Sequence, residues 1–452
     1  MANREPLGVW LNDTKIAVFS ERGATIRCRY LQENLLSVPS ESPVLSCSLP
    51  LGGGRLNATN FATGLLPEGD HRRAMAEMAG VPSRDTFGLL ARFGRDVAGA
   101  LVIGYEAPDQ HPGSALPYTE KGLNDEVSGL AERPLGLYDD SELSLPGLQN
   151  KLLLIRRRDG RWARPVHGEP STNILKVDDP RHVGLVAGEA DCLRIARDLG
   201  LTLSEPEVVE LGGTTCLIVE RFDRRIEDGH LIRVHQEDAC QALDRDPDAN
   251  RGHGKYQRAG GPSLAEIARL LDQWSIDARS QRDLLLRATT LNVVVGNADA
   301  HGKNLALLHP TMTSVELAPL YDVVPTVLWE SLRIDAAMSI NGRWNVHTIS
   351  VSDLIAEGVS WHMSEKDATR SVTETIEAAR EAADRLEDNS KVATLIRSRS
   401  ETLLRARTSS TVRGTSPAAR GTQPRVPRGM RTGGQFDEKI NPKATHDLGD
   451  GG

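Results

Sequence analysis

The feature that most constrains the fold is a strongly apolar stretch, residues 282–295, that stops at a polar loop. Its length and composition predict a buried helix, which needs apolar partners around it. Apolar residues make up 39% of the chain, enough to build a packed core around such a helix. The loop Gly296-Asn-Ala-Asp-Ala-His-Gly-Lys-Asn304 therefore follows directly on buried structure.

Two residues of this loop, Asp299 and Asn304, have the spacing found in kinase catalytic loops. Phosphoryl transfer needs a carboxylate that orients the attacking hydroxyl and takes its proton, and an amide oxygen that holds Mg²⁺ beside it. The two residues are five positions apart, as are the Asp and Asn of the kinase motif H-R-D-x-x-x-x-N. His301 and Lys303 add polar or positive groups near a transferring phosphoryl group. Asp299 is thus the candidate catalytic residue.

A second metal ligand is expected further along the chain. Tyr321-Asp322 follows the short stretch 314–317, which gives the kinase order of catalytic loop, short strand and metal-binding Asp. We therefore expect Asn304 and Asp322 to hold Mg²⁺. By spacing alone, a polar turn that closes a helix is the better interpretation of the loop. The presence of His301 and Lys303 in the loop, and of Tyr321-Asp322 at the right distance after it, reverses that preference.

A β-rich block, residues 143–178, precedes the loop and carries a candidate phosphate-binding lysine. Apolar runs around an Asp159-Gly160 turn predict a hairpin, and Asn173-Ile-Leu-Lys-Val177 predicts a further strand. Lys176 can reach the α- and β-phosphates of ATP, as the strand lysine of kinases does. Glu189, on the next expected helix, is the candidate partner of this lysine. The alternative is a lysine exposed at a strand edge.

Taken in order, these motifs resemble those of HipA-type kinases. The loop 296–304 and the following Leu317-Ala-Pro-Leu-Tyr-Asp-Val-Val324 resemble the catalytic loop and metal-binding segment of that family. The resemblance covers about residues 6 to 400, and by it the chain is identified as a HipA family serine/threonine kinase, the toxin of a HipBA toxin–antitoxin system. Further segments match family motifs in the family's order: residues 61–70, 93–101, 144–151, 219–225, 236–238 and 260–262.

The resemblance also implies a phosphate-covering loop at residues 144–151. Ser144 matches the serine whose phosphorylation inactivates family members, because a dianionic phosphate seeks basic partners and pulls the loop away from ATP. Asn150 departs from the family, whose best-known members carry an acid there. The ATP-binding residues expected in this loop are Pro146, Gly147, Leu148, Gln149, Asn150 and Lys151.

The segment Glu220-Arg-Phe222 ends an apolar strand and is the expected adenine hinge. The alternative is that Arg221 and Arg224 only form surface ion pairs with Glu220 and Asp223. The ATP-binding residues expected outside the phosphate-covering loop are Lys176, Glu220, Arg221, Phe222, His301, Lys303 and Tyr321.

The patterns and the resemblance together imply an α+β fold of the bilobal protein-kinase-like type, with an extra N-terminal β-containing subdomain. A C-terminal tail rich in Arg, Gly, Pro, Ser and Thr is expected to be disordered. It is either a solvated linker or a contact for nucleic acid or an acidic partner. The expected divisions are an N-terminal subdomain (1–105), a linker or loop (106–142), a small β-rich lobe (143–235), a helical lobe (236–408) and the tail (409–452).

Composition limits the function further. The net charge of −8 argues against a chain that binds nucleic acid over its whole surface. Its five scattered cysteines indicate neither a disulfide framework nor a zinc site. The N-terminus lacks the apolar run of a signal peptide, and no apolar stretch is long enough to span a bilayer. A cytoplasmic protein without a membrane partner is expected.

The resemblance implies ATP and Mg²⁺ as cofactors and a protein as substrate, with an aminoacyl-tRNA synthetase as one candidate. It further implies autophosphorylation of Ser144, slowed growth, and a separate helix-turn-helix antitoxin of the HipB type, through which operator DNA is bound. One alternative is a catalytically idle module that acts as a co-repressor. Another is a small-molecule phosphotransferase. An idle module would be expected to have lost at least one of four residues that are all present: Lys176, Asp299, Asn304 and Asp322.

Overall fold

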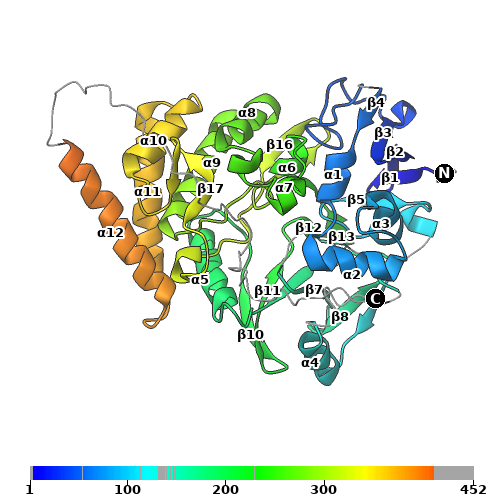
Figure 1. Ribbon diagram of the computed structural model, residues 1–452, viewed down its shortest axis with the longest axis horizontal. Coiled ribbons are helices and arrows are strands. Elements are labelled where there is room, and N and C mark those ends of the chain that lie inside the picture. The colour runs from blue at the N-terminus through cyan, green and yellow to red at the C-terminus, as the bar shows by residue number, and fades with distance from the viewer. Residues whose placement is uncertain are drawn as a thin grey trace, which may run out of the picture.

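A computed structural model describes most of the chain up to Thr411, with side chains to Arg405 (Figure 1). The N-terminal subdomain and helices α10, α11 and α12 lie at opposite ends of the molecule, and the small lobe lies between and below them (Figure 1). The expected tail falls outside the described residues, except that residues 409–411 end helix α12. The described residues are 4–52, 54–110, 113–130, 138, 140–142, 144–145, 149–228 and 230–411, the side chain of residue 109 excepted.

The N-terminal subdomain is a five-stranded antiparallel sheet with helices packed on it. The apolar residues of its strands and helices close a core of their own. The sheet has the order β4-β3-β2-β1-β5. Its strands are β1 (Leu7–Leu11), β2 (Thr14–Arg22), β3 (Thr25–Tyr30), β4 (Arg55–Asn57) and β5 (Leu101–Gly104), and its helices are α1 (Thr59–Gly64), α2 (Gly69–Ala79) and α3 (Thr86–Phe93).

The small lobe is a six-stranded sheet of order β10-β11-β9-β7-β8-β6, in which neighbouring strands are antiparallel. Its register places Lys151 directly across from Lys176, on adjacent strands. Helix α5 (Leu185–Asp198) connects this sheet to the core of the helical lobe. The strands are β6 (Ser114–Pro117), β7 (Lys151–Arg156), β8 (Trp162–Val166), β9 (Asn173–Val177), β10 (Glu207–Leu211) and β11 (Thr214–Glu220).

Part of the segment expected to be a linker or loop, residues 106–142, is ordered structure of the small lobe. Strand β6 forms the edge of the sheet beside β8, and helix α4 (Glu120–Ser128) follows it. Leu123 and Val127 pack against strand residues of the sheet, because their spacing places them on one side of α4, and Leu130, just after the helix, joins them. Helix α4 was not predicted because its apolar face is short and is surrounded in the sequence by many polar, Pro and Gly residues.

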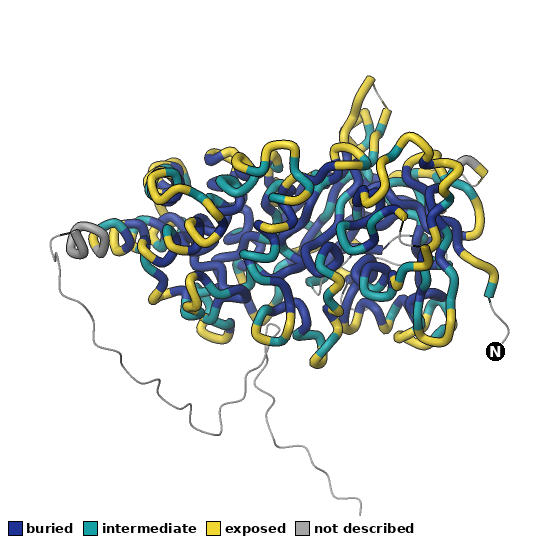
Figure 2. Tube along the Cα trace, turned by 90° about the horizontal axis from the view of Figure 1, so that it is seen from above, coloured by how far each residue is buried: buried dark blue, intermediate teal, exposed yellow. Residues whose placement is uncertain are grey.

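The helical lobe surrounds helix α9 (Ala278–Val294), whose C-terminal half is buried as predicted. Buried stretches of the chain run through the interior of the molecule, and exposed stretches lie mostly at its rim (Figure 2). A capping box formed by Ser263 and Glu266 lies at the start of α8 (Leu264–Trp274). The remaining long helices are α10 (Val351–Ser360), α11 (Glu365–Ala383) and α12 (Lys391–Thr411). The lobe is not purely helical: β14 (His235–Asp238), β15 (Ala306–Thr311) and β16 (Ser314–Leu317) form a three-stranded sheet, and β17 (Asp335–Ile340) pairs with β18 (Arg343–Asn345).

Short elements complete the lobes: β12 (Arg224–Glu227), β13 (His230–Arg233), α6 (Ala239–Ala242), α7 (Ala249–Gly252) and the 3₁₀ turns Gln32–Asn34, Pro108–Gln110, Gln257–Ala259 and Thr326–Leu328. Within the part of the chain that the structure describes, every helix is too short or too polar to cross a membrane.

Candidate active site

A cavity lies where the N-terminal subdomain, the small lobe and the helical lobe meet. Most of the candidate site residues predicted from the sequence line this cavity, although they belong to elements far apart in the chain. Ser144 and Asn150 are not part of its lining, and Pro146, Gly147 and Leu148 lie outside the described residues. The expected site residues that line the cavity are Gln149, Lys151, Lys176, Glu189, Glu220, Arg221, Phe222, Asp299, His301, Lys303, Asn304, Tyr321 and Asp322.

The loop after helix α9 is fixed by hydrogen bonds between its own residues. The N–H of Asp299 donates to Oδ1 of Asn297 over 3.0 Å. The Nδ2 group of Asn304 donates to the carbonyl oxygen of Asp299, also over 3.0 Å. Because the nitrogen of the Asn304 amide is engaged, its oxygen is the atom left to hold a cation. The side chain of Asn304 is thus tied to the backbone of Asp299.

Asp322 adds a second carboxylate and adopts a left-handed backbone, with φ of 55°. Its Oδ1 accepts a hydrogen bond of 2.8 Å from Nζ of Lys176. Burial acts to raise the pKa of Asp322, but the nearby Lys176 outweighs it and lowers that pKa to about 2. Asp322 is therefore ionised at neutral pH, as a metal ligand must be.

Lys176 also makes the contact with Glu189 that the sequence predicted. Its Nζ lies 2.6 Å from Oε1 of Glu189, on helix α5. The ammonium of Lys176 thus bridges Glu189 of helix α5 and Asp322, and all three residues line the cavity. Lys151, opposite Lys176 in the sheet, is a second buried lysine. Its burial, and then the charge of Lys176, lower the pKa of Lys151 to about 8.

These donors suit Mg²⁺ with nucleotide phosphates. Mg²⁺ is commonly held by one or two carboxylates together with substrate phosphates, and seldom by a complete cage of protein ligands. The free amide oxygen of Asn304 and the carboxylate of Asp322 are donors of that kind, and Lys151 and Lys176 offer charge to the phosphates. No cluster of three His, Cys, Asp or Glu side chains among the described residues forms a metal cage.

His301 and Lys303 were expected to be polar or positive groups near the phosphate, and the structure shows that only Lys303 is positively charged. Burial lowers the pKa of His301 well below its ordinary value, so its imidazole is polar and not positive at neutral pH. Lys303 keeps its charge, because Asp238 and Glu68 raise its pKa against the effect of burial. Its Nζ donates to Oδ2 of Asp238 and to the carbonyl of Gly64, each over 3.1 Å. Lys303 thereby joins the loop 296–304 to the N-terminal subdomain.

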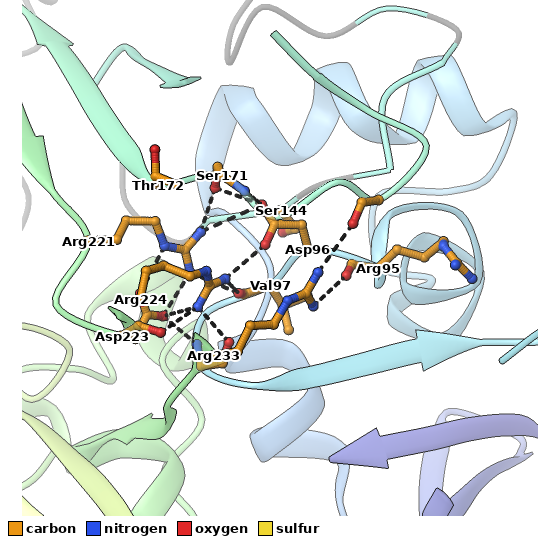
Figure 3. Close-up of polar contacts among 12 residues, drawn as sticks. Arg95, Asp96, Val97, Ser144, Ser171, Thr172, Arg221, Asp223, Arg224 and Arg233 are labelled. Atoms are coloured by element: carbon orange, nitrogen blue, oxygen red, sulfur yellow. Dashed lines mark hydrogen bonds and ion pairs between the residues drawn. The ribbon is translucent and has the colours of Figure 1, made fainter. Parts of the chain in front are cut away.

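The expected hinge lies at the end of β11, beside a buried ion-pair network (Figure 3). Arg221 pairs with Asp223 over 2.8 Å, and Arg224 pairs with Asp96 of the N-terminal subdomain over 2.8 Å. The alternative of surface ion pairs is wrong in two respects, because the pairs are buried and Asp96 takes the place of Glu220. Arg221 lines the cavity, but its charge is already paired inside the protein.

The rest of the hinge region faces the cavity with aromatic rings. Phe222 and Tyr321 are stacked, with ring centroids 5.3 Å apart. The hydroxyl of Tyr321 donates to the carbonyl of Lys303 over 2.6 Å, so this ring is tied to the catalytic loop. Together they form an apolar wall on which a planar base can rest.

Ser144 is fully buried beside the ion-pair network. Its hydroxyl donates to the carbonyl of Leu65 over 3.0 Å, and its N–H donates to the carbonyl of Asp96 over 2.9 Å. Asn150, the residue that departs from the family, contacts His71 of helix α2 over 3.0 Å. Both residues therefore hold the start of the small lobe against the N-terminal subdomain.

Sequence reasoning missed two residues of the site, Lys255 and Tyr256. The Tyr256 hydroxyl donates to Oδ1 of Asp299 over 2.8 Å. Nζ of Lys255 donates to Oε2 of Glu68 over 2.8 Å, and both residues line the cavity. The nearest signal was the motif Gly260-Gly-Pro262, which by itself had no chemical interpretation.

Burial raises the pKa of Asp299, against the lowering effect of the neighbouring Lys255 and of the Tyr256 hydrogen bond. Burial likewise raises the pKa of Tyr256, so its hydroxyl remains a donor. A carboxylate whose pKa is raised is a better proton acceptor once it is ionised.

A small antiparallel lobe with a lysine–glutamate pair, a helical lobe with an Asp–Asn loop and a following Asp define a protein-kinase-like phosphotransferase. The family models agree: the HipA N-terminal domain matches residues 7–104, and the HipA-like C-terminal domain matches residues 143–386. The chain belongs to the HipA family and is a HipA-type kinase.

Known proteins with this architecture are similar over most of the chain. Putative kinase Y4mE of Sinorhizobium fredii is 36% identical over 409 residues, 85% of this chain and 92% of that protein. Serine/threonine-protein kinase toxin HipA of Shewanella oneidensis is 31% identical over 330 residues, 69% of this chain and 73% of that protein. A chain in the solved complex of Shewanella oneidensis HipA, HipB and operator DNA matches with a TM-score of 0.73 and 26% identity, covering 88% of this chain and 97% of that one.

Proposed function

We propose that the protein is a serine/threonine protein kinase that transfers the γ-phosphate of ATP to a protein hydroxyl, as the toxin of a type II toxin–antitoxin module. The observation that carries this proposal is the convergence of Asp299, Asn304 and Asp322 with the Lys176–Glu189 pair on one cavity. The proposal is supported by the hydrogen bonds that hold the side chains of Asp299, Asn304, Asp322 and Lys176 in place.

The roles follow from the contacts. Asp299 orients the hydroxyl of the acceptor and takes its proton. Lys176 and Lys151 bind the phosphates, and Glu189 keeps Lys176 in place. Phe222 and Tyr321 face the adenine, which the backbone of the hinge at Glu220 holds. When bound to Asn304 and Asp322, Mg²⁺ would neutralise the charge that develops on the phosphates.

Ser144 is the proposed site of autophosphorylation, by resemblance to the family. Its hydroxyl is buried and donates to Leu65, so it must leave this position before it can accept a phosphate. A dianionic phosphate cannot return to this fully buried place without free basic partners, and the nearby Arg221 and Arg224 are already paired with Asp223 and Asp96. Phosphorylation would therefore keep residues 144–151 away from the nucleotide and inactivate the kinase.

The substrate and the partner are proposed from the relatives. We propose a protein substrate that acts in translation, with an aminoacyl-tRNA synthetase as the candidate, whose phosphorylation slows growth. We also propose a separate HipB-like antitoxin, because the similar solved structure contains HipA together with HipB and operator DNA. Binding of operator DNA would then occur mainly through the antitoxin, in the cytoplasm.

The test is incubation with γ-labelled ATP and Mg²⁺, followed by mass spectrometry. We expect phosphate on Ser144 in the wild type and none with Asp299→Ala, while binding of a non-hydrolysable ATP analogue is retained. Equal labelling of the two proteins would exclude Asp299 as the catalytic residue. Binding of the analogue without any transfer by the wild type would favour the idle co-repressor module instead. Transfer to an aminoglycoside-like small molecule and to no protein would favour the small-molecule phosphotransferase.

Growth tests the toxin role separately. Expression of the wild type should slow growth, and expression of Asp322→Ala should not, because this variant loses a metal ligand. Equal growth arrest by both proteins would mean that the effect does not depend on phosphoryl transfer.

A further inference from the structure

The segment Gly254–Pro262 lies directly against the catalytic loop. The carbonyl of Lys255 accepts a hydrogen bond of 3.1 Å from the N–H of Gly302. The hydroxyl of Tyr256 donates to Oδ1 of Asp299 over 2.8 Å. One short piece of chain therefore contacts both the backbone of the loop and its catalytic side chain.

Two glycines shape this contact, Gly261 within the segment and Gly302 in the loop. A Cβ atom on Gly261 would meet the carbonyl carbon of Lys255 at 2.6 Å. A Cβ atom on Gly302 would meet the ring of Pro262, also at 2.6 Å. A side chain at Gly302 would push the segment and the loop apart, and a side chain at Gly261 would disrupt the turn that folds Gly261 back onto Lys255 within the segment. The motif Gly260-Gly-Pro262 thus has a physical reason, which is the contact between this segment and the catalytic loop.

The ring of Tyr256 is confined on several sides. The Arg333 guanidinium lies over it, 4.2 Å from the ring centroid. His301 meets it edge-on, with ring centroids 5.2 Å apart. The backbone is also tied, because the N–H of Tyr256 donates to His253 and its carbonyl accepts from Gly261. A buried ring with so many neighbours has one rotamer, so the hydroxyl has one position.

We propose that Tyr256 is a positioning residue for phosphoryl transfer, whose hydroxyl occupies Oδ1 of Asp299 and leaves Oδ2 facing the hydroxyl of the protein substrate. This inference rests on the proposed role of Asp299. Among the residues that the structure describes, no group donates a hydrogen bond to Oδ2 of Asp299. A carboxylate held by one oxygen cannot rotate freely, and such alignment of the reacting groups lowers the barrier to transfer.

The test is Tyr256→Phe, which keeps the packed ring and removes only the hydroxyl. We expect kcat to fall about 10- to 100-fold, because a misaligned catalytic group costs rate and not substrate binding. The KM for ATP and the Kd of a non-hydrolysable ATP analogue should stay within about twofold of the wild type. The matched control is Tyr138→Phe, which removes a hydroxyl that donates to the carboxylate of Glu126 over 2.5 Å, outside the cavity. This control should keep the wild-type kcat.

Three results would overturn the inference, and they can be told apart. A wild-type kcat in Tyr256→Phe, with Asp299→Ala inactive, would remove the role of Tyr256 and leave the proposed function intact. A parallel loss of kcat, ATP affinity and melting temperature would show that the hydroxyl only supports the fold. Absence of transfer by the wild type would remove the proposed function and this inference with it.

Discussion

The buried ion-pair network between the N-terminal subdomain and the hinge predicts a large effect of Asp96→Asn. Asp96 is fully buried. Its Oδ1 accepts from Arg224 over 2.8 Å, and its Oδ2 accepts from the N–H and the hydroxyl of Ser171 over 3.0 and 2.7 Å. Asparagine has the same shape but no charge, so Arg221 and Arg224 would be left with Asp223 as their one carboxylate partner within this network.

The expected cost follows from known buried pairs. Removing one partner of a buried ion pair destabilises a protein by about 3–5 kcal/mol, because the other charge stays buried. For a chain of this size that unfolds as one unit, this corresponds to a fall in melting temperature of about 4–6 °C. Differential scanning calorimetry of the two proteins at pH 7 measures this fall. The matched control is Asp159→Asn, which removes an exposed partner of Arg161 and should leave the melting temperature nearly unchanged.

A melting temperature of Asp96→Asn equal to that of the wild type would refute this reasoning. It would mean that the two arginines find other partners or water once Asp96 is neutral. The same measurement shows whether the N-terminal subdomain and the kinase lobes unfold together. A single transition that moves as a whole in the variant is expected, because the network joins the two parts.

Two further predictions concern the charge at the phosphate site and the start of helix α8. The pKa of Lys151 is lowered from 10.5 to about 8, and bound phosphates should raise it again. ATP binding above pH 8 should therefore take up a proton, and the affinity for ATP should fall as the pH rises. Isothermal titration calorimetry in two buffers of different ionisation enthalpy measures this uptake, which should be absent in Lys151→Met. An affinity for ATP that does not depend on pH would contradict this. Ser263→Ala should cost about 1 kcal/mol by urea denaturation, and Ser263→Gly only a few tenths; equal losses would exclude the cap.

The parts of the fold that could be predicted from the sequence are those fixed by local chemistry. Ser263 and Glu266 form a capping box because both partners lie within one helical turn. The pair of Lys176 and Glu189 could also be predicted, because a strand and the helix that follows it commonly pack together. Asp299 and Asn304 belong to a single loop, and the hydrogen bond between them is local.

The parts that could not be predicted depend on contacts between distant segments. Tyr256 lies 43 positions from Asp299, and Asp96 lies 128 positions from Arg224. No local pattern marks such pairs, and only the packing of the N-terminal subdomain on the two lobes brings Asp96 to the hinge. Helix α4 was missed for a different reason, because its apolar face is short and lies among Pro, Gly and acidic residues.

The most direct test of the central claim compares the wild type with Asp299→Asn in a single-turnover reaction with γ-labelled ATP and Mg²⁺. Asparagine keeps an oxygen for the Tyr256 hydrogen bond, so the loop should hold its shape and the nucleotide should bind as before. We expect labelled phosphoserine in the wild type, and in the variant normal nucleotide binding with a transfer rate at least about 100-fold lower. Transfer by Asp299→Asn at the wild-type rate would contradict the claim that Asp299 is the catalytic residue.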